Sequence, residues 1–109
     1  MTYSGARVIL ATVTPRPGKA KKVIELYQGI IDYAIKHEPG CFEFQLFSEV
    51  NVEGVEEIFT IERFKDLETL RAHQAGPALV AFNKAAAEQD LLEKEILIKV
   101  VKSVSGFQV

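Results

Sequence analysis

One segment of this sequence combines the end of a helix with the start of a strand: His37-Glu38-Pro39-Gly40-Cys41-Phe42-Glu43-Phe44-Gln45-Leu46-Phe47. Pro39 cannot continue a helix, and it moves the residue before it out of helical geometry. We expect Gly40 to take the positive φ that a sharp reversal of the chain needs. From Cys41 onward aromatic and polar residues alternate with a period of two, which is typical of a strand. The segment therefore predicts a helix that folds back onto a sheet within a few residues.

The residues before this segment predict a strand and then the helix that ends in it. Arg7–Thr14 is almost continuously apolar, as in a central strand that is covered on both faces. From Lys19 to Lys36 apolar residues recur at steps of three and one, which indicates a helix with one apolar and one charged face. The apolar set consists of Ala20, Val23, Ile24, Tyr27, Ile30, Ile31, Ala34 and Ile35.

The residues after the segment predict a hairpin and a helix. Asn51–Gly54 has the composition of a turn, and Glu56–Phe64 that of the returning strand. Asp66 is a suitable N-cap for a short helix that runs to about Gln74.

A further helical segment and a final strand complete the chain. Pro77 suits the first turn of a helix over Ala78–Glu88, and Leu91–Val104 is rich in strand-forming residues. The order strand, helix, strand, strand, helix, strand predicts an α+β, ferredoxin-like βαββαβ fold with an antiparallel sheet. We expect a single domain over residues 1–109, with a core of about 7–104.

The composition excludes several classes of protein. The 109 residues are 48% hydrophobic and 26% charged, and a net charge of -2 offers no basic surface for nucleic acid. Cys41 is the single cysteine, which favours a reducing compartment. No segment resembles a signal peptide or approaches the roughly 18 apolar residues of a membrane span. We therefore expect a cytoplasmic protein with neither a nucleic-acid nor a membrane partner.

The two hairpin strands predict a partner of another kind. Neither alternate set of residues in Cys41–Phe47 or Ile58–Phe64 is cleanly polar, as one set would be if one face of the sheet were solvated. Burying a large apolar side chain is worth ~1.5–3 kcal/mol, so an open face with several of them would be costly. A chain this short can most easily cover that face with a second copy. We predict a homodimer that forms through the sheet face.

Three motifs in order make the chain similar to the antibiotic biosynthesis monooxygenase (ABM) family. They are Glu38-Pro39-Gly40-Cys41 before the aromatic strand, Ile61-Glu62-Arg63-Phe64-Lys65-Asp66, and the helix that reaches Ala72-His73. The resemblance extends from about Arg7 to Val101. It implies a dimeric α+β barrel with a ligand cavity between sheet and helices in each subunit. Enzymes of this family include cofactor-independent monooxygenases that convert phenolic or anthrone-like rings into quinones with O2. Relatives of the same fold degrade haem or isomerise small metabolites.

Three residues depart from the patterns that this resemblance implies. Phe64 stands where many members have tryptophan, so an aromatic wall remains but the indole N–H donor is lost. Thr60 stands where some quinone-forming members have asparagine. Asn83 lies near the place of the iron-binding histidine of haem-degrading relatives, and an amide is a poor haem ligand. Because the chain also has no glycine-rich dinucleotide motif and no metal-site spacing of Cys or His, we expect neither a cofactor nor a metal.

His73 and Glu62 are the candidate catalytic residues. An imidazole that points into the cavity and pairs with Glu62 could take or hold a proton from a phenolic substrate. Alternatively, His73 caps helix carbonyls or braces Glu62 without touching a substrate. Glu62 could act as a general base, or it could orient its partner and stabilise the fold.

The candidate substrate-binding residues surround this pair. Three aromatic rings could stack on a flat ligand or could be plain core, and two polar residues complete the set: Phe44, Phe64, Phe82, Thr60 and Asn83. We expect a monooxygenase that uses O2 on a small phenolic or polycyclic aromatic metabolite and forms a quinone. Two other functions stay open: a non-catalytic dimeric binder of an aromatic metabolite, and an isomerase or lyase in which Glu62 and His73 move a proton.

Overall fold

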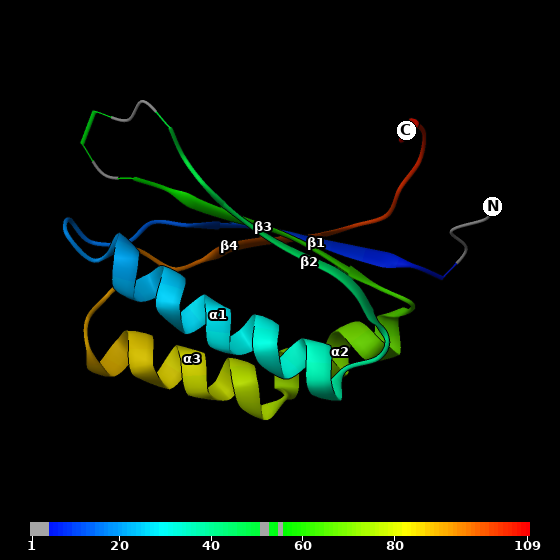
Figure 1. Cartoon of the computed structure of the whole chain (residues 1–109), viewed down its shortest axis with the longest axis horizontal. Coiled ribbons are helices and arrows are strands. Elements are labelled where there is room, and N and C mark those ends of the chain that lie inside the picture. The colour runs from blue at the N-terminus through cyan, green and yellow to red at the C-terminus, as the bar shows by residue number, and fades with distance from the viewer. Residues whose placement is uncertain (1–4, 51–52, 55) are drawn as a thin grey trace.

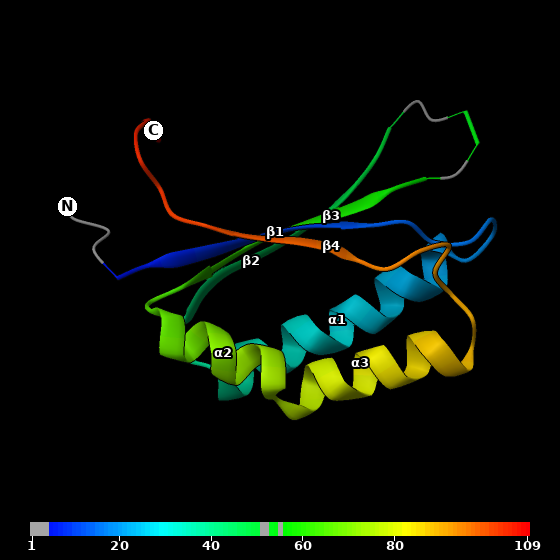
Figure 2. The ribbon, with the colours of Figure 1, turned by 180° about the vertical axis from the view of Figure 1, so that it is seen from behind.

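The computed structural model describes residues 5–50, 53–54 and 56–109. Its elements are β1 (Arg7–Val13), α1 (Ala20–His37), β2 (Cys41–Ser48), β3 (Ile58–Phe64), α2 (Leu67–Ala75), α3 (Pro77–Glu88) and β4 (Leu97–Val101). In this part of the chain the strands form one antiparallel sheet in the order β2-β3-β1-β4, and the helices lie on one face of it (Figure 1, and from behind in Figure 2). This is the predicted α+β, ferredoxin-like arrangement. None of the helices described is long and apolar enough to cross a membrane.

The core forms where alternate strand residues meet the helices. In β3 every second residue from Ile58 to Phe64 is buried, as the period of two in the sequence predicts. The helix α1 buries one stripe of side chains, Val23, Tyr27, Ile30 and Ala34. Most of the buried apolar residues fall into two clusters, one around α1, α3 and Ile58, and the other around Ile9, Phe64 and Leu70.

The reversal between α1 and β2 occurs as predicted, but not for the predicted reason. Gly40 is not among the residues with positive φ. Instead α2 passes so close that a Cβ atom at position 40 would lie 2.5 Å from Cγ2 of Thr69. The carbonyl of Gly40 accepts a hydrogen bond of 2.9 Å from the backbone N–H of Lys65. Glycine is therefore needed here for space, not for backbone freedom.

Both predicted helix starts are confirmed. Asp66 is the N-cap of α2, and its Oδ1 accepts a hydrogen bond of 2.8 Å from the backbone N–H of Thr69. Pro77 occupies the first turn of α3, where a missing N–H costs nothing. The break between the two helices falls at Gly76, as the sequence predicts.

The last strand is shorter than the predicted Leu91–Val104, because the residues before Leu97 have another role. Leu91 is buried in the core, and its carbonyl accepts a hydrogen bond of 2.8 Å from the backbone N–H of Arg16. Leu92 forms only an isolated bridge with Pro15. The apolar residues here close one end of the core rather than alternate along a sheet. The returning strand likewise begins at Ile58, not Glu56, and the predicted turn Asn51–Gly54 lies partly outside the described residues.

The face of the sheet away from the helices is largely apolar. The strand register places three rows of side chains on it. Two rows hold most of the apolar residues: Phe47, Phe59, Thr12 and Leu97, and then Gln45, Ile61, Leu10 and Lys99. The third row is Glu43, Arg63, Val8 and Val101. Leu10 is 41% exposed and Leu97 is 56% exposed. None of the described helices covers this face. The expectation that neither sheet face is cleanly polar is met.

Candidate active site

A cavity of about 130 Å³ lies between the sheet and the helices. Its lining combines residues of both core clusters and includes Ile96, which packs against both of them. The apolar walls are Ile9, Ala11, Ile30, Phe44, Leu79, Ile96 and Ile98, and the polar groups are Tyr27, Glu62, His73, Gln74 and Asn83. Gln74 and Asn83 are exposed residues of α2 and α3, so the cavity reaches solvent beside these helices.

His73 connects two carboxylates across the site. Its Nδ1 lies 2.6 Å from Oε1 of Glu38, the residue that follows α1. Its Nε2 lies 3.3 Å from Oε1 of Glu62, on β3. The ring is only 3% exposed, and it lies against Phe64 and Phe44 with ring centroids 4.9 and 6.0 Å away. These contacts fix the imidazole plane between its two partners.

Thr60 extends this row on the sheet. Its Oγ1 donates a hydrogen bond of 2.6 Å to Oε2 of Glu62, two residues along the same strand face. Both oxygens of Glu62 therefore have a partner, and the carboxylate is 5% exposed. A buried charge is tolerated only when it is paired and hydrogen-bonded, and these contacts meet that condition. The row Glu38–His73–Glu62–Thr60 thus runs from the chain reversal to the middle of the sheet.

The geometry favours a charged His73. Burial by itself would lower the pKa of His73, but the hydrogen bonds and charges of Glu62 and Glu38 raise the pKa above its ordinary value of 6.5. A neutral imidazole donates from one nitrogen only, whereas here both nitrogens face a carboxylate. A doubly protonated ring has no site left to accept a proton. Glu62 lines the cavity and is the member of the row that can accept one from a ligand.

Tyr27 brings a second polar group to the cavity. It is 4% exposed, and its ring lies 4.5 Å from that of Phe82 and 6.4 Å from that of Phe44, measured between centroids. Burial, and then the negative charge of Glu62, raise the pKa of the Tyr27 hydroxyl, which therefore stays protonated as a donor. Within the described residues this hydroxyl makes no hydrogen bond.

The structure brings together only some of the predicted site residues. His73, Glu62, Phe44 and Asn83 line the cavity. Thr60 lies behind Glu62, and Phe64 lies behind His73. Phe82 is 2% exposed and packs on Tyr27 from the outer side, so it reaches the cavity only through that ring.

Sequence reasoning missed Glu38 and Tyr27. Glu38 stands in the very segment that predicts the chain reversal, but its position before Pro39 indicated only backbone geometry. Tyr27 was assigned to the apolar face of a helix. Its hydroxyl was the feature that could have marked it as a site residue, because a buried tyrosine needs a polar partner. Two further residues with titratable side chains lie near the chain reversal: partial burial raises the pKa of Cys41 to about 11, and His37 is exposed at the end of α1.

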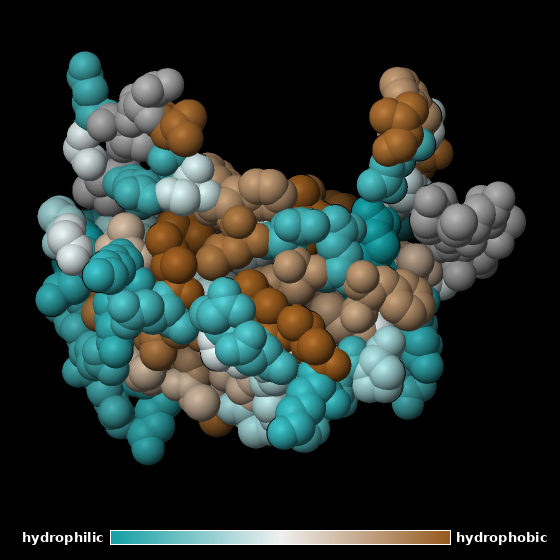
Figure 3. Space-filling model, in the orientation of Figure 1, coloured by the Kyte–Doolittle hydropathy of each residue, from teal (hydrophilic) through white to brown (hydrophobic). Residues whose placement is uncertain are grey.

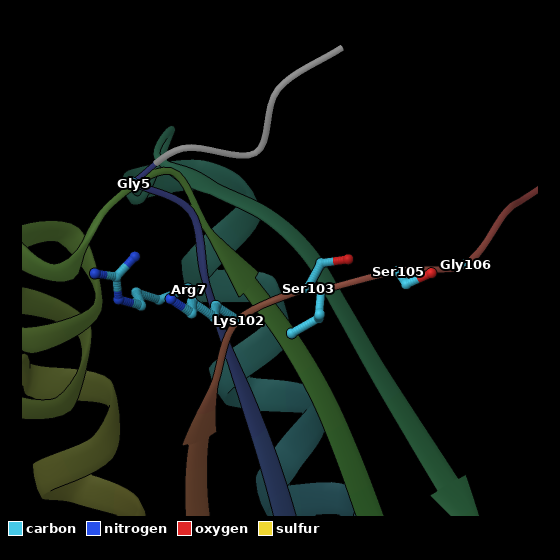
Figure 4. A pocket seen from close by; sticks show the side chains of 7 residues that line it. Gly5, Arg7, Lys102, Ser103, Ser105 and Gly106 are labelled. Atoms are coloured by element: carbon cyan, nitrogen blue, oxygen red, sulfur yellow. The ribbon is translucent and has the colours of Figure 1, made fainter.

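A wider hollow of about 660 Å³ lies at the end of the sheet, between the two chain ends (Figure 4). Its described walls are Gly5, Arg7, Lys102, Ser103, Val104, Ser105 and Gly106. The set includes no carboxylate, imidazole or aromatic ring, and the side chains of Arg7 and Lys102 reach the same side of the chain (Figure 4). The row of acid and imidazole lies apart from this hollow: Glu62 and His73 line the smaller cavity, and Glu38 and His73 also line a surface hollow of about 460 Å³ beside the chain reversal.

Comparison with known proteins places the chain in a family. The family model of antibiotic biosynthesis monooxygenases matches residues 6–85. The chain belongs to the antibiotic biosynthesis monooxygenase family, as the sequence motifs predict. A search of curated proteins finds no significant match.

Solved structures show the same fold. A protein of Mycobacterium tuberculosis is 20% identical, with a TM-score of 0.79 over 94% of this chain and 99% of that one. A conserved protein of Methanosarcina mazei has the same identity and TM-score, over 94% and 96% of the two chains. A structure described as an antibiotic biosynthesis monooxygenase is 18% identical, with a TM-score of 0.75 over 91% and 99%. At these identities the likeness concerns the fold.

Proposed function

We propose that this protein is a cofactor-independent monooxygenase that oxidises a small phenolic or polycyclic aromatic metabolite with O2 to a quinone. The supporting observation is the carboxylate of Glu62, which faces an apolar cavity and is held there by His73 and Thr60. Membership of a family named for monooxygenases points the same way.

The reaction requires only a proton acceptor and an apolar pocket from the protein. A phenol gives its proton to Glu62, and the phenolate transfers one electron to O2. The resulting phenoxyl radical and superoxide combine at the para carbon, and the peroxide loses water to leave a quinone. The balance is one phenol and one O2 to one quinone and one water. The apolar walls withdraw the ring from water and hold it near O2.

His73 is a positioning residue in this scheme. Its imidazolium sits between Glu38 and Glu62 and holds the second carboxylate in place, while the first offers a second negative charge to the ring. Loss of the imidazole would release the carboxylate of Glu62 from its position rather than remove a group that touches the substrate ring. This role combines the two alternatives considered for His73, because a residue that braces Glu62 also determines where the proton acceptor lies in the cavity.

We propose further that the protein acts as a homodimer in the cytoplasm, formed through the open sheet face. That face carries the two apolar rows described above. Figure 3 shows apolar surface in the hollow between the raised hairpin and the C-terminal tail. Val104 and Phe107 in this tail are 88% and 92% exposed, so the tail adds apolar area that a second copy would bury.

Oxygen uptake tests the function. Phenols, hydroquinones and anthrones are added in turn to the protein in an oxygen-electrode cell, and quinone is measured by its absorbance. We expect uptake of one O2 per quinone with at least one substrate. Glu62→Gln should reduce the rate by about 100-fold or more, because general-base catalysis contributes roughly 10²–10⁴-fold. The matched control is Glu68→Gln on the exposed side of α2, which should keep the wild-type rate.

The same assay separates the alternatives. Tight binding of an aromatic compound without oxygen uptake would indicate that the protein is a non-catalytic binder of that compound. Product formed without oxygen would indicate an isomerase or lyase. A fully active Glu62→Gln variant would contradict the assigned proton acceptor.

A further inference from the structure

We propose that Tyr27 and Glu62 form a two-point clamp for the hydroxyl of a single-ring phenol, with Tyr27 donating to the phenol oxygen and Glu62 accepting its proton. This inference rests on the proposed function and narrows its substrate to one aromatic ring.

The polar groups in the cavity are arranged for such a ligand. Tyr27 from α1 and Glu62 from β3 both line it, and the Tyr27 ring is held from outside by Phe82. Buried tyrosines usually find a hydrogen-bond partner for their hydroxyl. Tyr27 as a residue is only 4% exposed and lines the cavity, yet its hydroxyl makes no hydrogen bond within the described residues. A phenol oxygen is both a donor and an acceptor, so it satisfies a carboxylate and a tyrosine hydroxyl together.

The size of the cavity selects the ring system. Its volume is about 130 Å³. An engineered protein cavity of about 150 Å³ holds one benzene molecule, whereas sites for drug-sized ligands measure roughly 300–1,000 Å³. A single ring therefore fits between Phe44, Ile30 and the sheet residues, whereas a tricyclic anthrone would extend beyond these walls into solvent. The single ring must then be electron-rich, with further hydroxyl or methoxy groups, to give an electron to O2.

Binding measurements without turnover test the clamp. Phenol, anisole, toluene, 1-naphthol and 9-anthrol are titrated anaerobically into the protein by calorimetry. In the wild type we expect phenol to bind more tightly than anisole, which cannot donate to Glu62, and anisole more tightly than toluene. The compounds with two and three rings should bind more weakly than phenol.

Variants isolate the Tyr27 hydroxyl. Tyr27→Phe keeps the ring but removes the hydroxyl, so the affinity for phenol should fall by roughly five- to tenfold, the effect of one hydrogen bond. The affinity for toluene should stay within about twofold of the wild-type value. Tyr33→Phe is the matched control, since Tyr33 lies on the same helix but outside this cavity. It should leave all the affinities unchanged.

The outcomes distinguish the clamp from the function on which it rests. Equal phenol affinity in Tyr27→Phe and the wild type, or tighter binding of 9-anthrol than of phenol, would overturn the clamp even if oxygen uptake is found. If Tyr27→Phe does not fold, equal affinities of phenol, anisole and toluene for the wild type would overturn it instead. The expected affinities without oxygen uptake from any phenol would leave the clamp standing and refute the monooxygenase.

Discussion

His73 is the residue on which the candidate site depends. It is the one cation between two largely buried carboxylates, Glu38 and Glu62, and its two contacts join three elements of the fold. Removing one member of such a buried set leaves the others without compensation, which is far more costly than the net value of the pair.

The contribution of His73 to stability should depend on pH. Its folded pKa is raised above the ordinary 6.5, so the stabilisation is fully present below that value and is lost as the pH rises through the folded pKa. We expect His73→Gln to lower the free energy of unfolding by ~3–5 kcal/mol near pH 6 and by progressively less towards pH 9. Urea denaturation over this range measures the difference.

An exposed histidine provides the control. His37→Gln removes the other histidine of the chain, which lies at the exposed end of α1, and it should change the free energy of unfolding little at any of these pH values. A destabilisation by His73→Gln that is constant with pH would show that the imidazole is not charged in the folded protein.

At the scale of elements, the close approach of α2 to the chain reversal positions the site. His73 reaches Glu38 only because Gly40 lets Thr69, one turn earlier on α2, come close to the backbone. The N-cap Asp66 fixes the start of the same helix. The packing of one helix against one turn therefore sets the distance between the imidazole and its first carboxylate.

A methyl group at position 40 should disturb this packing. Gly40→Ala places a Cβ atom 2.5 Å from Cγ2 of Thr69, so we expect a loss of ~1–3 kcal/mol in the free energy of unfolding. Thr69→Ser removes that methyl and keeps the hydroxyl, so adding it to Gly40→Ala should recover part of the loss. Thermal and urea unfolding measure both variants.

The matched control is Gly29→Ala in α1. A Cβ atom at this position has no neighbour within 4 Å, and alanine favours a helix over glycine by ~0.5–1 kcal/mol. This variant should therefore be slightly more stable than the wild type. A Gly40→Ala variant that is equally stabilised would refute the steric role of Gly40.

At the scale of the whole molecule, the arrangement of one helical layer under one sheet leaves the other sheet face open (Figure 2). The rows of apolar residues on it are the surface that the proposed dimer would bury. A charge near the middle of these rows should prevent association, because it would lose its hydration in the interface.

Ile61→Glu is expected to convert a dimer into a monomer. Ile61 lies opposite Leu10 and Gln45 in the register, near the middle of the face. Sedimentation equilibrium at micromolar concentration should give twice the chain mass for the wild type and the single chain mass for the variant. Ile35→Glu is the control: Ile35 is 81% exposed on α1, so this variant should remain dimeric. A monomeric wild type would refute the dimer.

Local signals in the sequence were sufficient for most of the architecture. The period of two in β3, the period of the apolar stripe in α1, the break at Pro39 and the cap at Asp66 each depend on residues close in the chain. They determine which segments become helices or strands and which faces are apolar. The family motifs pointed to Glu62 and His73 as a pair, and the two side chains lie 3.3 Å apart. The short connection between β3 and α2 was enough to predict that the two would meet.

Tertiary packing alone decided the rest, because its contacts join residues that are distant in sequence. Glu38 lies 35 positions from His73, and only the close packing of α2 on the reversal makes it the first partner of the imidazole. The apolar pattern of α1 placed Tyr27 in the core but could not show that its hydroxyl faces an unfilled volume near Glu62. The segment Leu91–Ile96 had strand-like composition, yet Leu91 is buried in the core cluster that includes Phe82 and Ala86 of α3, and the strand begins only at Leu97. The type of a residue limits the interactions that it can make, whereas the packing of the folded interior determines which residues it contacts.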